Sequence, residues 1–160
     1  MKRFCLSILL LTVISCEGLP SEPDGLRALA NKMETQKDTY DKAYDNWNSG
    51  DVTSTFTSYL DGNAVAFIEE HMTRGTSGRS INRYYFYNDE IFCYRENRNN
   101  SDSTRVEVEI LFDVNGDVMV AKQKQNNQPV TVDNYIVPMA KKHGQTLRTL
   151  TKDAPIMQNE

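Results

Sequence analysis

The sequence predicts a single α+β domain at residues 26–152, with a helix near each end and an antiparallel meander sheet of five or six strands between them. Two observations carry this prediction. Apolar residues first recur at helical spacing and later alternate with polar residues at period two. Turn-forming residues separate the alternating segments, as they do in consecutive hairpins. Such a sheet is expected to have one core face and one polar face.

The first predicted element is an amphipathic helix that begins near Leu26, with Asp24 as a capping residue. Its apolar stripe recurs at spacings of three, four and seven residues: Leu26, Leu29, Met33, Tyr40, Tyr44 and Trp47. Asn48-Ser49-Gly50-Asp51 supplies the expected stop. The stripe is predicted to dock on the sheet, and a self-associating coiled coil is the alternative.

The strands are predicted to follow a polar stretch at 51–58. They lie at 64–68, 79–87, 90–96, 104–112 and 118–122, with an edge strand at 129–132. The residues 113–117 contain Asn115-Gly116, which takes the positive φ angles of a hairpin turn. Their likeness to a calcium loop is superficial, because Lys124 stands where the bidentate glutamate of an EF-hand belongs. No metal site is predicted.

The last predicted element is a short helix from Pro138 to Leu150, with proline in its first turn. Met139, Ala140, His143, Leu147 and Leu150 share one face of it. Gly144 is the weak point of the pattern, because glycine disfavours a helix interior. Residues 153–160 are expected to be a frayed tail.

The amino terminus has the three parts of an export signal. Lys2 and Arg3 make a positive start, and Phe4–Ile14 is an apolar run too short to cross a bilayer. The string Val13-Ile14-Ser15-Cys16 resembles the lipobox of bacterial lipoproteins. The resemblance covers residues 1–16 and implies that residues 1–15 are removed and that Cys16 is lipidated. An ordinary secretory signal and an uncleaved anchor are the alternatives.

Several consequences follow from a lipidated Cys16. Residues 16–25 would be the lipidated cysteine and a tether rich in proline and glycine. Two or three acyl chains hold a protein stably in a membrane. Because Glu17 is not the aspartate that retains some lipoproteins in the inner membrane, the outer membrane is favoured over the inner membrane of the cell envelope.

Cysteine usage and charge agree with export. Cys5 lies in the signal, so Cys93 is the one cysteine left for the folded domain, and it is predicted to be a buried, inert thiol. The chain carries 18 basic and 22 acidic side chains, so removal of Lys2 and Arg3 leaves a net charge of about −6. That charge argues against nucleic acid as a partner.

The sequence shows no catalytic or cofactor motif. His71 and His143 do not have the spacing of metal ligands to another His or Cys. A pair of Cys93 as nucleophile and His71 as base has no local feature that would activate the thiol. Glu69 and Glu70 are adjacent on a strand, so their side chains are expected on opposite faces. The predicted site residues are therefore confined to Cys16 for lipidation and to a set of partner-binding candidates.

These candidates come from an aromatic hairpin and a basic loop. Six aromatic residues lie at 84–87, 92 and 94, and they must divide between both faces of a hairpin. Helices and tyrosine pairs could cover them, or Tyr85, Tyr87 and Tyr94 could form an exposed surface of the composition found at protein interfaces. The loop at 74–79 adds Arg74 and Arg79, and is either a flexible connection or an anion cradle.

The sequence thus favours a lipid-anchored, non-enzymatic envelope protein that binds another protein and needs no cofactor. A small-ligand binder or enzyme with a pocket between sheet and helices is one alternative. An inhibitor or immunity-type lipoprotein acting against a hydrolase is another. A flat exposed tyrosine patch would favour protein binding, whereas a closed cavity with convergent polar groups would favour a ligand site.

Overall fold

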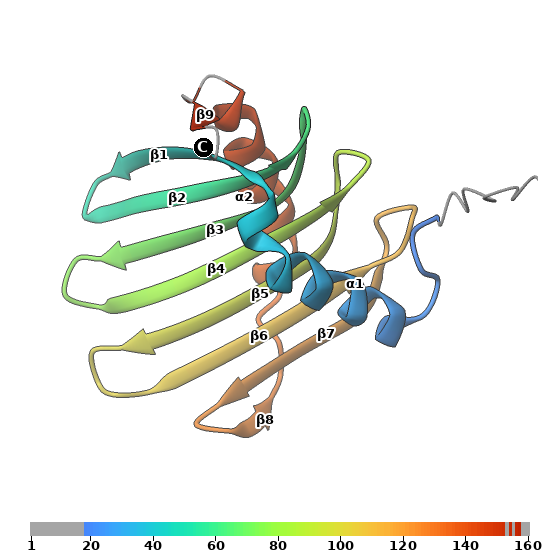
Figure 1. The fold of residues 1–160 in the computed structure, drawn as a ribbon. Coiled ribbons are helices and arrows are strands. Elements are labelled where there is room, and N and C mark those ends of the chain that lie inside the picture. Colours follow the sequence, from blue (N-terminus) through green and yellow to red (C-terminus); the bar gives the residue numbers. More distant parts are fainter. Residues whose placement is uncertain (1–17, 153, 155, 158–160) are drawn as a thin grey trace, which may run out of the picture.

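The computed structural model describes residues 18–152, 154, 156 and 157 (Figure 1). Helix α1 spans Pro23–Thr35, the short 3-10 helix η1 spans Lys37–Thr39, and helix α2 spans Ile136–Thr151. The strands are β1 (Asp41–Ser49), β2 (Val52–Asp61), β3 (Ala64–Arg74), β4 (Gly78–Tyr87), β5 (Glu90–Asn100), β6 (Arg105–Phe112), β7 (Val118–Gln125), β8 (Gln128–Val130) and β9 (Ile156–Met157). The predicted signal segment and Cys16 lie outside the described residues.

Strands β1 to β8 form one antiparallel sheet in which every strand pairs with its neighbours in the sequence. The two-residue β9 pairs with the free edge of β1. The predicted α+β class with five or six strands is therefore wrong. The described chain is mostly β, with eight meander strands and a helix at each end. The meander order itself was predicted from the hairpin signals.

The first error concerns the long N-terminal helix. Helix α1 ends at Thr35, and Asp41–Ser49 forms β1, which pairs with β2 along its whole length. Tyr44 and Trp47 satisfy the helical spacing, but aromatic residues are good strand formers and the intervening Asp and Asn residues are poor helix formers. Pairing with β2 therefore decided the conformation of this segment.

The second error concerns the polar stretch at 51–58, which forms most of β2. Its threonines are β-branched and suit a strand. Its small residues Ser54 and Ser58 lie on the face covered by α2 and are buried, with 3% and 0% of their surface exposed. Strands β3 and β5 also run several residues beyond their predicted ends, to Arg74 and Asn100.

The two helices cover opposite faces of the sheet (Figure 1). On the α1 face, Leu26 and Ala30 of the helix are buried against an aromatic stack in which Phe67 lies 4.1 Å from Tyr59 and 5.7 Å from Tyr85. Both faces thus carry a buried apolar cluster. This corrects the expectation of one core face and one polar face, because each helix shields apolar side chains from water.

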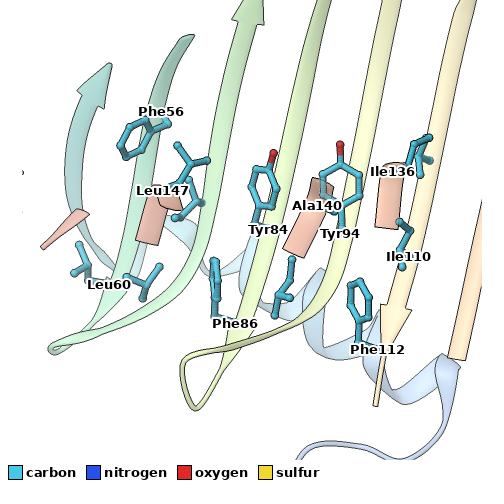
Figure 2. Close-up of a cluster of buried hydrophobic side chains, with 14 of the residues drawn as sticks. Phe56, Leu60, Tyr84, Phe86, Tyr94, Ile110, Phe112, Ile136, Ala140 and Leu147 are labelled. Carbon is cyan, nitrogen blue, oxygen red and sulfur yellow. The ribbon is translucent and has the colours of Figure 1, made fainter. Parts of the chain in front are cut away.

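On the α2 face, Ala140 and Leu147 of the helix pack on side chains from the central strands (Figure 2). At Gly144 an added Cβ would lie 2.8 Å from Cδ1 of Tyr84, so glycine lets the helix approach this ring closely. Figure 2 shows the Tyr84 and Tyr94 rings with their hydroxyls pointing the same way, away from Phe86 and Phe112. These two hydroxyls mark where the apolar part of the α2 face gives way to a polar part.

Candidate functional site: a buried polar cluster and cavity beside α2

The centre of the polar part is the carboxylate of Glu70, which is fully buried on the α2 face of β3. Its oxygens accept five hydrogen bonds, each from a different side chain. The donors are Trp47 Nε1 (2.9 Å), Ser54 Oγ (2.7 Å), Asn82 Nδ2 (3.0 Å), Tyr84 OH (3.2 Å) and His143 Nε2 (2.9 Å). Four strands and α2 therefore meet at one carboxylate.

The hydrogen bonds decide the ionisation of Glu70. Burial opposes the charged form and would raise its pKa, but hydrogen bonds from His143, Asn82 and Ser54 and the charge of His143 outweigh burial and lower the pKa to about 2. Glu70 is consequently ionised at neutral pH. A buried carboxylate held this way fixes the position of each group that donates to it.

Folding stability should therefore fall in acid through Glu70. Its pKa is about 2 in the folded chain, against an ordinary value of 4.5 for a glutamate, so its contribution is complete above pH 4.5 and is lost as the pH falls toward 2. We expect the wild type to lose about 2 kcal/mol from this group between pH 6 and pH 3. Urea unfolding at both pH values measures this. The expectation would be contradicted if the difference in stability between the wild type and Glu70→Gln were the same at pH 6 and at pH 3.

A second buried carboxylate, Glu96 of β5, lies on the same face at 2% exposure. Its Oε1 lies 4.0 Å from Nη1 of Arg74 and 3.5 Å from Nη1 of Arg98. Tyr94 OH donates to its Oε2 at 3.3 Å. Two guanidinium groups thus flank one carboxylate, and both arginine side chains keep part of their surface exposed, at 31% and 19%.

These groups border a cavity of about 440 Å³ between the sheet and the first turns of α2. Polar lining comes from Arg74, Glu96, Arg98 and His143, and apolar lining from Trp47, Val52, Met72, Tyr135, Ile136 and Met139. The volume lies within the range of roughly 300–1,000 Å³ that small-molecule sites occupy. A mainly apolar wall with a few convergent polar groups is typical of such sites.

The hydrogen-bonding capacity of this region is not fully used. Within the part of the chain that the structure describes, the buried side-chain atoms without a hydrogen-bond partner are Arg74 Nη1, Ser80 Oγ, Asn82 Oδ1, Glu96 Oε1 and Arg98 Nε. All belong to the neighbouring strands β3, β4 and β5, at alternating positions that share the α2 face. Buried polar atoms are nearly always paired in folded proteins, so their concentration here marks a region of unmet bonding capacity.

The predicted partner-binding residues do not come together. Tyr85 is fully buried on the α1 face, where its hydroxyl donates to Glu34, and Tyr87 is half-buried on the same face. Tyr94 is fully buried on the α2 face. Arg74 lines the cavity, whereas Arg79 is exposed and, by strand alternation, lies on the other face.

The remaining sequence candidates occupy separate places. Glu69 and Glu70 lie on opposite faces as expected, and Glu69 bonds to Arg83 and His71. Cys93 is fully buried, and burial raises the pKa of its thiol to about 12, which disfavours a thiolate nucleophile. Among the described residues no group of three or more His, Cys, Asp or Glu side chains could hold a metal ion.

The polar cluster was missed although strand alternation carries a signal for it. Glu70 lies two residues from both Ile68 and Met72, which are inward positions of β3, and Glu96 lies two residues after Tyr94. A charged residue on the inward side of a strand predicts a buried network, because a lone buried charge is too costly. His143 offered no such signal, since its partner lies 73 positions away.

No helix within the described residues is long and apolar enough to span a membrane. No family model matches the chain, and no curated protein and no solved structure matches it either.

Proposed function

We propose that this protein is a lipid-anchored envelope protein that binds a small ligand in the cavity between the sheet and α2. The observation that carries the proposal is the combination of a 440 Å³ cavity with buried polar groups of unmet hydrogen-bonding capacity at its border. Glu70 supports the site because it holds Trp47 and His143, which both line the cavity, in fixed positions. Preorganised walls reduce the entropy lost on binding.

The burial of the tyrosines favours this proposal over protein binding through the aromatic hairpin. Tyr85 and Tyr94 have 0% exposure, so a partner protein has no access to either ring in this fold. Helix α1 covers the face that holds Tyr85, and Tyr94 lies on the opposite face, which α2 covers. The convergent polar groups lie instead at a cavity, which is the arrangement expected of a ligand site.

The proposed anchor rests on the lipobox resemblance of residues 13–16. Cys16→Ala should abolish metabolic palmitate labelling and release the chain from the membrane fraction. Retained labelling would contradict the anchor without bearing on the cavity. Outer-membrane sorting, proposed from Glu17, is tested by separating the inner and outer membranes of the same cells.

Ligand binding can be tested with Trp47, which is the single tryptophan of the chain and lines the cavity. The full chain, reconstituted in neutral phosphatidylcholine vesicles, would be titrated with a library of small polar and amphipathic compounds while Trp47 emission is followed. Compounds that bind in the cavity should shift this emission saturably. Absence of any saturable response across the library would overturn the proposal.

A pair of valine variants identifies the binding place. Val52→Phe adds bulk to the cavity wall, whereas Val114→Phe adds the same bulk at a position with 75% exposure. Binding should weaken at least tenfold in the first variant and stay unchanged in the second. Equal affinity of the two variants would place the compounds elsewhere. Trp47 remains the reporter in both proteins, since phenylalanine does not interfere with its emission.

A further inference from the structure

We infer that the ligand is a small amphipathic monoanion, whose carboxylate or other oxyanion lies against Arg74 and Arg98 and whose apolar body lies against the apolar side chains that line the cavity. The inference rests on the proposed ligand-binding function and names the chemical class of the ligand. It comes from the charges and the surface composition of the residues that line the cavity.

The charge argument begins with Glu96. The two guanidinium groups that line the cavity share this one carboxylate, at 4.0 Å and 3.5 Å, so one positive charge has no counterpart among the lining residues. His143 adds no negative charge in either protonation state. Buried and half-buried charges are stable when they are paired, so a single negative charge on the ligand would complete the balance.

Glu70 does not supply that balancing charge. Its carboxylate is surrounded by five hydrogen-bond donors and does not line the cavity. Among the residues that the structure describes, no hydrogen-bond acceptor is found for Nη1 of Arg74 or for Nε of Arg98. Both guanidinium groups therefore have donor capacity left, and guanidinium groups bind carboxylate and phosphate oxygens with matched geometry.

The rest of the cavity argues against a bare inorganic ion. Trp47, Val52, Met72, Ile136 and Met139 contribute apolar side chains to its wall. A small hydrated anion would leave this surface in contact with water, whereas an aliphatic or aromatic body would cover it. The ligand should therefore need both its charge and its apolar body for tight binding.

A series of ligands with one apolar body and different head groups tests these requirements. Hexanoate, hexan-1-ol and hexylammonium would be titrated into the full chain in neutral phosphatidylcholine vesicles, with Trp47 emission as the signal, and inorganic phosphate and acetate would serve as anions without an extended body. We expect hexanoate to bind at least about tenfold more tightly than every other compound, the gain typical of a charge-assisted hydrogen bond.

Arginine variants test the position of the head group. Arg98→Gln and Arg74→Gln should each weaken hexanoate binding at least about tenfold while leaving hexan-1-ol binding unchanged. Arg79→Gln is the matched control, because Arg79 is an exposed arginine on the β3–β4 hairpin that also carries Arg74. This substitution should not change the binding of either compound. Circular dichroism checks that each variant is folded, and the wild-type ligand series decides the question by itself if a variant is not.

The outcomes separate this inference from the proposed function. Equal affinity for hexanoate and hexan-1-ol would overturn the inference and leave a cavity that binds neutral ligands. Phosphate binding as tight as hexanoate binding would also overturn it, in favour of an oxyanion site that ignores the apolar wall. If none of these compounds binds, the inference fails, and the compound library described above decides the proposed function independently.

Discussion

Replacing Glu70 with glutamine should lower the free energy of unfolding by about 3–5 kcal/mol, the loss typical when one partner of a buried charge network is removed. The substitution keeps the size of the side chain but leaves one acceptor oxygen where the carboxylate has two. The new amide nitrogen would face hydrogen-bond donors, among them Asn82 Nδ2 and Tyr84 OH on the Oε2 side. Unpaired buried donors then account for most of the loss.

The neighbouring glutamate provides a matched control. Glu69 carries the same carboxylate one position earlier, but it lies on the α1 face with a side chain that is 25% exposed. Its partners are Arg83 and His71, and ion pairs that stay in contact with solvent contribute about 0–1 kcal/mol. Urea unfolding at pH 7 should therefore separate Glu70→Gln from Glu69→Gln by several kcal/mol. Equal losses would show that Glu70 is not the centre of a buried network.

The same substitution should also affect the cavity. His143 and Trp47 both donate to Oε1 of Glu70 and both line the cavity, so their orientation depends on this oxygen. Their rings contact each other edge to face, with centroids 5.3 Å apart. The stability of the fold and the shape of the proposed ligand site are therefore coupled through one carboxylate.

Elements with a purely local signal could be predicted from the sequence. Asn115-Gly116 marks the turn between β6 and β7, and Oδ1 of Asp113 accepts the backbone N–H groups of Asn115 and Asp117 there. The aromatic hairpin turns at Asn88 and Asp89, which both have positive φ. The C-terminal helix was also predicted, although it begins at Ile136 and not at Pro138.

Elements decided by distant pairing could not be predicted in this way. The spacing of Tyr40, Tyr44 and Trp47 fits a helix, but Asp41–Ser49 pairs with β2 along its whole length and is a strand. The candidate site has the same limitation, because its parts lie on β1 to β5 and on α2, far apart in the chain. Alternation predicts that Glu70 and Glu96 lie on an inward face, but it does not predict that Arg74 and Arg98 flank Glu96.

Replacing Phe67 with alanine should lower the free energy of unfolding by about 3–5 kcal/mol, as truncation of a fully buried phenylalanine does. Phe67 is 1% exposed on the α1 face of β3, stacked nearly parallel to Tyr59 with an interplanar angle of 7°. Tyr85 packs on it at 5.7 Å and Tyr40 meets it edge to face at 6.2 Å. The substitution therefore leaves a cavity and removes three ring contacts at once.

The size of this loss distinguishes a two-sided core from a one-sided one. If the α1 face were the polar, solvated face that the alternation suggested, truncation there would cost little, as at most surface positions. Tyr44→Ala is the matched control, because Tyr44 is an aromatic strand residue with 44% exposure and should lose less than about 1 kcal/mol. Similar small losses for both variants would contradict a core beneath α1. A large loss at Phe67 alone means that α1 shields one face of the sheet while α2 and its polar cluster occupy the other.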